Sequence, residues 1–212
     1  MMGPGIALYW YDHFVFTPFI NMRAFAATVL LCSNPVQAFS AGAPKPLRTR
    51  CCGPHCGILK GIDPILSADL LYALRAAGHG DVIAVVDANF PAASTAQACV
   101  LDEPIVLAGV DCVTAMAAIG SVLPIDRFVE TPVGKMVPSE GLALPALGAE
   151  VHEQAVAALG DGIGVQEVER FDFYSIAEDA FVIVQCVGER RPYGCFLLTK
   201  GVVGPDGNDL MP

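Results

Sequence analysis

An unbroken apolar run, Val82 to Val86, constrains the fold of this chain more than any other stretch. Consecutive apolar residues without polar alternation are typical of a strand that is buried on both faces of a sheet. Before this run, leucines recur every four residues from Leu66 to Leu74, which predicts the apolar face of a helix. Ser67 is placed to cap the start of that helix, and Gly78 is placed to end it in a left-handed conformation. The stretch therefore predicts a helix, a turn and a buried strand.

Titratable side chains stand at both ends of the predicted strand and are the first candidates for a functional site. His79 precedes the strand and Asp87 follows it. In open α/β sheets, ligands bind at the carboxyl ends of strands, which favours Asp87 as a binding residue. Such a strand extends roughly 20 Å, so the two side chains can share a site only if the chain folds back or a second subunit supplies one of them. Alternatively, Asp87 caps a turn and His79 is a surface residue at the helix end.

Strand-like and helix-like segments alternate along the rest of the chain, which predicts an α/β fold with a largely parallel or mixed sheet. Residues 128–137 are predicted to form an edge strand or a loop, because Pro132 lacks a backbone donor. His152, on the polar side of a predicted helix, is expected to be exposed to solvent. The other predicted strands are 97–101, 165–170, 181–187 and 195–199, and the other predicted helices are 109–119, 150–159 and 173–180.

The charge of the chain is uneven and mainly acidic. The net charge is -10 over 212 residues, of which 54% are hydrophobic. Residues 1–57 hold four basic residues against one acidic residue, so this segment carries +3 and the remainder carries -13. A domain this acidic is a poor partner for nucleic acid. The expected partner is a neutral small molecule or another protein chain, and the high apolar content favours self-association.

The first 57 residues differ from the rest and are interpreted as an N-terminal leader or disordered extension, with the folded domain at 58–212. Met22 and Arg23 precede a short apolar run, which resembles a secretory signal. Residues 38–44 also resemble the junction of bipartite plastid-targeting leaders. A third interpretation is an upstream region that is wrongly included in the coding sequence. The apolar run is too short to cross a bilayer, which takes about 20 residues.

The cysteines and histidines give little support for metal or covalent chemistry. The segment Cys51 to Cys56 packs metal-ligand types more closely than a structural zinc site normally does. Past residue 57, four cysteines have no ligand-like spacing, and there are only two histidines and no nucleophile-elbow sequence. We therefore predict no metal site. The remaining polar residues suit binding a polyhydroxyl compound and moving protons on it, and they are His79, Asp87, Arg170, Tyr174 and Tyr193.

Five short motifs follow one another in the order in which they occur in a known family. The motifs are LKGIDP at 59–64, GHGD at 78–81, DANFP at 87–91, RFDFY at 170–174, and GER at 188–190 followed by Tyr193 and Gly194. Each motif alone is weakly specific, whereas the ordered set is a strong signal. Over roughly residues 58–203, the chain therefore resembles the L-fucose mutarotase branch of the RbsD/FucU family.

The resemblance implies a three-layer α/β/α sandwich with a mostly parallel mixed sheet. It also implies a ring-shaped homo-oligomer, a decamer in this family, with sites near subunit contacts. Because the predicted strand keeps His79 and Asp87 apart within one chain, a neighbouring subunit would then complete the pocket. No metal, cofactor or stable membrane span is implied, and the implied location is the cytoplasm. If residues 1–57 are a genuine leader, the alternative location is a plastid or the secretory route.

The activity that the resemblance implies is exchange between the α and β anomers of a free monosaccharide, L-fucose or a similar sugar. A base removes the proton of the anomeric hydroxyl, an acid protonates the ring oxygen, and the open-chain aldehyde recloses as the other anomer. By resemblance, His79 is the catalytic proton donor, and an imidazole can serve in both directions near neutral pH. The implied substrate-binding residues are Asp87, Arg170, Tyr174, Tyr193, Gly194 and Cys195.

Two positions depart from the family pattern. Cys195 stands where the family signature Tyr-Gly-Asn usually has its Asn, and Ala93 stands where many relatives carry His. A thiol poorly replaces an amide that both donates and accepts hydrogen bonds, so we expect weaker or altered sugar selectivity.

Two alternative functions stay open. One is the sister activity, a pyranase that interconverts the ring forms of ribose, and the other is a non-catalytic sugar-binding oligomer.

Overall fold

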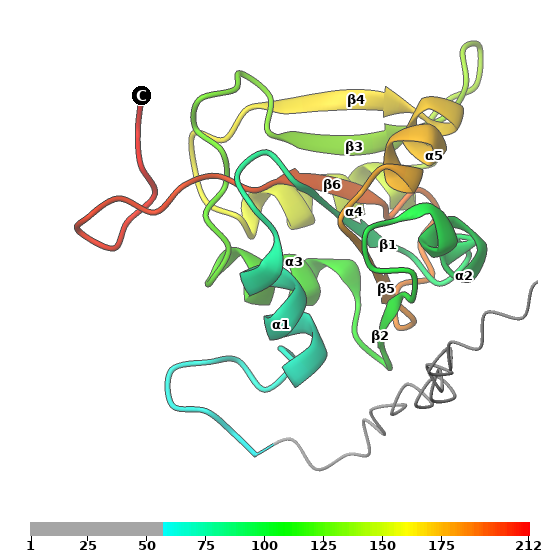
Figure 1. Cartoon of the computed structure of the whole chain (residues 1–212). Helices are drawn as coiled ribbons and strands as arrows, with labels where there is room; N and C mark the ends of the chain where they lie inside the picture. The colour runs from blue at the N-terminus through cyan, green and yellow to red at the C-terminus, as the bar shows by residue number, and fades with distance from the viewer. Residues whose placement is uncertain (1–56) are drawn as a thin grey trace, which may run out of the picture. The chain divides into compact units, whose positions relative to one another are not determined.

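The computed structural model describes residues 57–212 (Figure 1). The predicted leader and the cysteine-rich segment 51–56 lie outside the described residues, so the leader stays a prediction. Within residues 57–212 we find no helix with the length and hydrophobicity that a membrane span requires.

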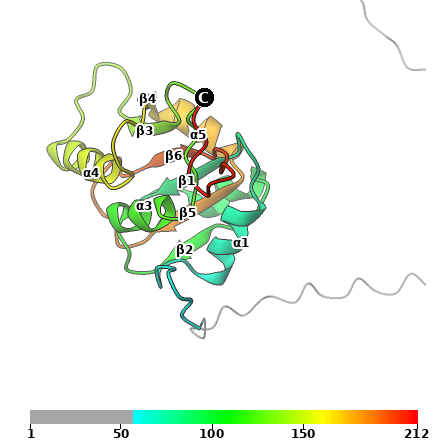
Figure 2. The ribbon, with the colours of Figure 1, turned by 90° about the vertical axis from the view of Figure 1, so that its left-hand side faces the viewer.

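A mixed sheet of six strands forms the centre of the described chain, in the order β2-β5-β1-β6-β3-β4, which runs from bottom to top in Figure 2. Neighbouring strands are parallel except at β6, which is antiparallel to β1 on one side and to β3 on the other. The strands are β1 (Val82–Val86), β2 (Ile105–Leu107), β3 (Val133–Val137), β4 (Val165–Glu169), β5 (Val182–Cys186) and β6 (Phe196–Thr199).

Strand β1 lies inside the sheet, as its apolar sequence predicts. Ala84 pairs with Ile183 of β5 on one side and with β6 on the other. Ile83 and Val85 are fully buried in the core on one face of the sheet. Ala84 and Val86 are fully buried in the core on the opposite face. Because successive side chains of a strand point to opposite faces, burial of both faces removes the need for polar alternation.

Helices cover both faces of the sheet and complete the predicted three-layer α/β/α sandwich. Helices α1, α3 and α4 pack on one face through Leu70, Met116 and Val151. Helices α2 and α5 and the 3₁₀ turn η1 pack on the other face through Ala92, Phe173 and Ala96, respectively. The helical segments are α1 (Ala68–Ala76), α2 (Ala92–Thr95), η1 (Ala96–Ala98), α3 (Cys112–Gly120), α4 (Ala146–Ala157) and α5 (Arg170–Glu178).

The predicted start of α1 is confirmed, but its predicted end is wrong. Ser67 Oγ accepts a hydrogen bond of 3.2 Å from a backbone N–H of the first turn, which is the expected N-cap. At the other end Ala77 is already extended, and the left-handed glycine is Gly80, with φ of 86°, rather than Gly78. The N–H of Gly78 instead donates to Asp81 Oδ2 at 2.6 Å. A carboxylate therefore closes this turn, so Gly78 needs no left-handed conformation.

Two predicted segments differ in the structure. Residues 97–101 are not a strand, because the alanine-rich stretch after Pro91 is helical from Ala92 to Ala98 and alanine strongly favours a helix. Residues 128–137 contain an interior strand rather than an edge, since β3 is paired on both sides. Pro132 directly precedes β3, so its missing N–H leaves the ladder of hydrogen bonds intact.

Helices α4 and α5 begin earlier in the sequence than predicted, and for α5 this changes the element that holds Arg170. Helix α4 starts at Ala146, because Pro145 can begin a helix although it cannot continue one. Helix α5 starts at Arg170 and is capped by Glu169, whose Oε2 accepts a hydrogen bond of 2.7 Å from the N–H of Phe171. Arg170 therefore lies in the first turn of a helix rather than in a strand.

Candidate active site

The direction of the strands gathers the predicted binding residues at one edge of the sheet. Strands β1, β3, β4 and β5 run the same way, so the residues that follow them meet at their carboxyl ends. Strand β6 runs the opposite way, so the residues that precede it reach the same edge. Asp87 follows β1, Arg170 follows β4 and Cys195 precedes β6. We call this group the carboxyl-edge cluster, and it comprises Asp87, Arg170, Tyr174, Tyr193, Gly194 and Cys195.

Asp87 is only 5% exposed, and its carboxylate shapes the turn after β1. Its Oδ1 accepts hydrogen bonds from the backbone N–H groups of Asn89 at 2.9 Å and of Phe90 at 3.0 Å, which confirms the turn-capping interpretation. Burial raises the pKa of Asp87, and the nearby charge of Glu189 adds to this rise, while hydrogen bonds to the carboxylate oppose it. Asp87 is thus both a turn-capping residue and a member of the cluster.

Cys195 is buried beside Asp87, at the position where the family signature has an amide. Burial, followed by the negative charge of Asp87, raises the pKa of the Cys195 thiol well above its ordinary value. The thiol is therefore neutral, and it lies close enough to the Asp87 carboxylate to lower the pKa of that carboxyl. It supplies one weak donor where an amide would supply two donors and an acceptor.

Arg170 and Tyr174 bring a guanidinium and a hydroxyl from α5. Burial raises the pKa of Tyr174, the charge of Arg170 lowers it, and the other titratable members of the cluster raise it, so the hydroxyl lies within electrostatic reach of them all. The ring of Tyr174 contacts the ring of Phe90, with centroids 5.4 Å apart. The guanidinium of Arg170 lies 4.5 Å above the ring of Phe171. Its Nε is buried and meets no hydrogen-bond acceptor among residues 57–212.

A buried ion pair, which the sequence analysis missed, holds the loop between β5 and β6. The Glu189 carboxylate accepts hydrogen bonds from Arg191 through the backbone N–H at 2.9 Å, Nε at 2.8 Å and Nη2 at 2.6 Å. It also accepts one of 3.3 Å from the backbone N–H of Cys112, at the start of α3. Burial opposes ionisation of Glu189, but the hydrogen bonds from Arg191 outweigh it and lower the pKa. The motif at 188–190 contains Glu189 but not Arg191, and no local pattern indicates that the Glu189 side chain is buried.

His79 lies at the opposite edge of the sheet, where it is paired with Asp126. His79 Nε2 and Asp126 Oδ2 are 3.1 Å apart, and the side chains are 51% and 3% exposed. Asp126 Oδ1 accepts a hydrogen bond of 2.9 Å from the backbone N–H of Phe128, which fixes the carboxylate. A buried carboxylate in this position orients an imidazole. Sequence analysis missed Asp126, because the partners are 47 positions apart and no local pattern links them.

The length of β1 separates His79 from Asp87. Its five residues span about 16 Å at about 3.3 Å each. The prediction that the two side chains lie at opposite ends of the strand is therefore confirmed. Within one chain, the His79–Asp126 pair and the carboxyl-edge cluster are two separate groups.

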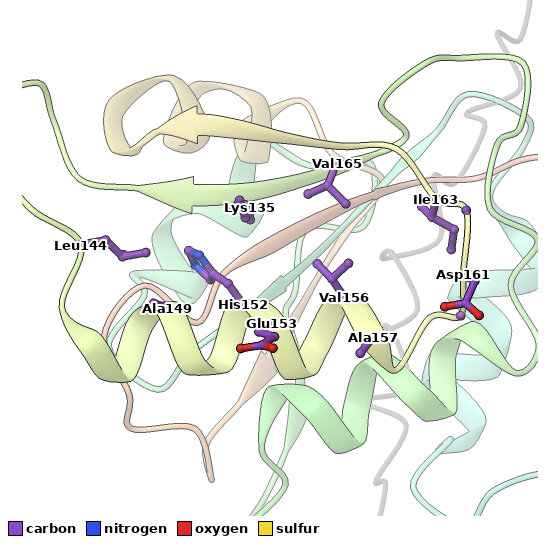
Figure 3. A pocket seen from close by; sticks show the side chains of 12 residues that line it. Lys135, Leu144, Ala149, His152, Glu153, Val156, Ala157, Asp161, Ile163 and Val165 are labelled. Carbon is purple, nitrogen blue, oxygen red and sulfur yellow. The ribbon is translucent and has the colours of Figure 1, made fainter.

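His152 is buried, so the prediction of a solvent-exposed side chain is wrong. Its exposed fraction is 3%, and its Nε2 lies 2.8 Å from the backbone carbonyl oxygen of Tyr193. The pattern of α4 is misleading because a backbone carbonyl, rather than water, satisfies this polar ring. Figure 3 shows His152 extending from α4 toward the sheet, beside a cavity of about 480 Å³.

Among residues 57–212, no three side chains of His, Cys, Asp or Glu lie together in an arrangement that could hold a metal ion. The four cysteines of this part of the chain are buried free thiols.

Comparison with known proteins identifies the family. The profile of the RbsD / FucU transport protein family matches residues 60–203. The chain belongs to the RbsD/FucU family. A fucose mutarotase from Homo sapiens is 38% identical over 150 residues, which cover 68% of this chain and 94% of that protein. An L-fucose mutarotase from Glaesserella parasuis is 37% identical over 147 residues, which cover 68% of this chain and 96% of that protein.

Solved structures from the family share the fold. The fucose mutarotase from Streptococcus pneumoniae, in complex with L-fucose, is 31% identical with a TM-score of 0.60, and the match covers 69% of this chain and 100% of that chain. A putative sugar binding protein is 42% identical with a TM-score of 0.63, and the match covers 70% of this chain and 98% of that chain. These matches confirm the predicted family and the predicted α/β sandwich.

The replacement Arg191→Met tests whether the buried ion pair stabilises the domain. It leaves the Glu189 carboxylate buried without its partner, which should lower the free energy of unfolding by about 3 to 5 kcal/mol. The exposed neighbour Arg190 gives a matched control, and Arg190→Met should change it by less than about 0.5 kcal/mol. Urea unfolding of the full chain at pH 7 measures both variants. Equal losses in the two variants would contradict the role of the pair.

Proposed function

We propose that this protein is a mutarotase that interconverts the α and β anomers of L-fucose. The observation that carries the proposal is the match with the Streptococcus pneumoniae protein, because this chain spans the whole of a fucose mutarotase that was solved with L-fucose. Curated relatives named fucose mutarotase, between 35% and 38% identical, support the same activity. The roles given to individual residues below are part of the proposal.

The carboxyl-edge cluster has the chemistry to bind a sugar. Arg170 Nε is a buried donor that meets no acceptor within residues 57–212, and Asp87 supplies a carboxylate acceptor. The hydroxyls of Tyr174 and Tyr193 can each donate and accept. A monosaccharide presents hydroxyl groups that need such partners, and the aromatic rings supply apolar surface for its carbon skeleton. We assign sugar binding to this cluster.

The reaction needs an acid and a base and no change of oxidation state. A base takes the proton of the anomeric hydroxyl as the bond between the anomeric carbon and the ring oxygen breaks, and an acid gives a proton to the ring oxygen. Rotation about the bond to the aldehyde carbon and the reverse proton transfers then give the other anomer. We assign proton transfer to His79. The His79 Nε2 lies 3.1 Å from Asp126 Oδ2, which leaves the His79 Nδ1 to face the sugar.

A second copy of the chain would complete the site. His79 and Asp87 are separated by about 16 Å of β1, which is longer than one pyranose ring. We therefore propose a homo-oligomer in which the His79 edge of one chain meets the carboxyl-edge cluster of another. Phe128 and Val129, which follow Asp126 closely, are 49% and 45% exposed and give the His79 edge an apolar surface for such a contact.

Loss of His79 should remove most of the rate acceleration. Replacement His79→Ala should slow anomer exchange by about 10²- to 10⁴-fold, the usual contribution of an acid–base group. Asp126→Asn should slow it less, because an amide oxygen still orients the imidazole, although it is a weaker hydrogen-bond acceptor than a carboxylate. NMR exchange between the α and β anomeric protons of L-fucose, with the full chain at pH 7 and buffer alone as the blank, measures the rates.

The exposed residue Asp102 provides a control, since Asp102→Asn should leave the exchange rate unchanged. A wild-type chain that broadens the fucose signals without accelerating exchange would contradict the mutarotase proposal. It would favour a sugar-binding oligomer, a function that the 42% identical putative sugar binding protein also suggests. Acceleration of ribose ring interconversion but not of fucose exchange would favour the pyranase alternative.

Mixing two inactive variants tests whether two chains share one site. His79→Ala damages one edge and Arg170→Met damages the other, so each variant alone should be slow. If they are unfolded and refolded together in equal amounts, about a quarter of shared sites receive both intact edges. The mixture should therefore recover about a quarter of the wild-type exchange rate. Exchange that stays as slow as in the separate variants would rule out the shared site.

Cys195, which departs from the family pattern, can be replaced by the asparagine that is usual in the family. Cys195→Asn adds an amide that can donate and accept, and one added hydrogen bond should tighten L-fucose binding or speed exchange by about 2- to 10-fold. An NMR titration with L-fucose measures binding, and the NMR exchange experiment above measures the rate. Cys99→Ser is the matched control, because Cys99 is also buried but its Sγ donates to the Ala177 carbonyl at 3.2 Å, outside the cluster. No change in Cys195→Asn would count against a role of Cys195 in binding.

A further inference from the structure

The turn that leads into β6 has an uncommon backbone conformation at the proposed sugar site. Tyr193 has φ of 64°, and within residues 57–212 it is the only residue other than glycine with a positive φ. This left-handed conformation is costly for an aromatic residue and persists only where its surroundings hold it. Gly194 and Cys195 follow directly, and β6 begins at Phe196. The conformation of Tyr193 therefore decides how the cluster residues enter the sheet.

His152 holds this turn from the layer of helices. Its Nε2 lies 2.8 Å from the carbonyl oxygen of Tyr193. A carbonyl oxygen only accepts, so Nε2 carries the hydrogen, and in a neutral ring Nδ1 then carries none. The ring packs edge to face on Phe196, with centroids 5.6 Å apart. The imidazole is thus fixed between the turn and the first residue of β6.

Helices α3 and α4 hold neighbouring residues of the turn as well. The Cys112 thiol donates to the carbonyl of Gly194 at 3.0 Å. A Cβ on Gly148 would lie 2.9 Å from the carbonyl oxygen of Pro192, so α4 packs directly against the turn at this glycine. The hydrogen bond from His152 acts on Tyr193 itself, the residue that bears the strain.

The surroundings keep the His152 ring neutral. Burial lowers the pKa of His152 and so does the charge of Lys135 on β3, while the Tyr193 carbonyl and the charge of Glu167 on β4 raise it. Lys135 and Glu167 are themselves paired at 3.1 Å, so little net charge faces the ring. Nδ1 is buried and meets no hydrogen-bond partner within the described chain. A second proton placed there would have no acceptor.

We propose that His152 is a positioning residue of the sugar site, whose neutral imidazole holds the Tyr193 carbonyl and so keeps Tyr193, Gly194 and Cys195 in place to bind the sugar. The inference rests on the function proposed for the carboxyl-edge cluster. His152 acts through the backbone of the turn and not on the reacting atoms. Its loss should therefore weaken sugar binding more than it slows proton transfer.

Three variants of the full chain test this role. His152→Leu removes the donor, His152→Gln keeps an N–H of similar reach, and Glu153→Gln changes an exposed neighbour on the same helix. His152→Leu should raise KM for L-fucose by about tenfold, because Tyr193 is then free to leave its left-handed conformation. The same variant should change kcat by less than about threefold, and His152→Gln should restore KM to within about threefold of the wild-type value. Glu153→Gln should match the wild type.

The inference would be overturned if KM for L-fucose is unchanged in His152→Leu. It would also be overturned if KM is no lower in His152→Gln than in His152→Leu. Nitrogen-15 NMR of the imidazoles tests it without sugar, and the His152→Gln spectrum identifies the His152 signals. The expected result at pH 7 is a neutral ring with its hydrogen on Nε2, and a hydrogen on Nδ1 would overturn the inference. Because this spectrum requires no activity, it separates the two proposals. A wild-type chain that fails to accelerate fucose exchange overturns the proposed function instead.

Discussion

The antiparallel insertion of β6 between β1 and β3 is the constraint on which the candidate site depends. Leu198 of β6 pairs with Ile83 on one side and with Val133 on the other. In a wholly parallel sheet, the residues before this strand would lie at the opposite edge from Asp87. Because β6 runs antiparallel to its neighbours, its entry turn lies at the carboxyl ends of β1 and β3. A shift of one residue in its register would send Cys195 to the other face of the sheet.

The features that could be predicted from the sequence are those that depend on local patterns. The buried strand β1 follows from an apolar run, and the N-cap at Ser67 follows from one residue before a helix. The residues of the carboxyl-edge cluster follow from short motifs that stand directly after or before strands. Since parallel strands end at a common edge, Asp87 and Arg170 could be grouped once the α/β class was predicted. Tyr193, Gly194 and Cys195 reach that edge only because β6 is antiparallel, and only the family resemblance placed them in the site.

The features that could not be predicted depend on contacts between distant segments. Asp126 follows no motif, and its role appears only when the sheet brings it to His79. Arg191 and Glu189 read as surface charges until the loop is seen to bury one of them. His152 has the spacing of a polar helix position, yet a backbone carbonyl from another segment satisfies it. In each case the polar group finds its partner in the tertiary structure, which helical periodicity does not report.

The length of β1 also affects how the activity would depend on the concentration of the protein. In the proposed shared site, a chain that is folded but alone carries two half-sites that face away from each other. Folding stability and catalytic capacity are then separate quantities, since the core sets the first and association sets the second. A sugar bound across two chains binds the assembly and not the single chain, so by mass action it favours assembly. The substrate would thereby promote the formation of the sites that convert it.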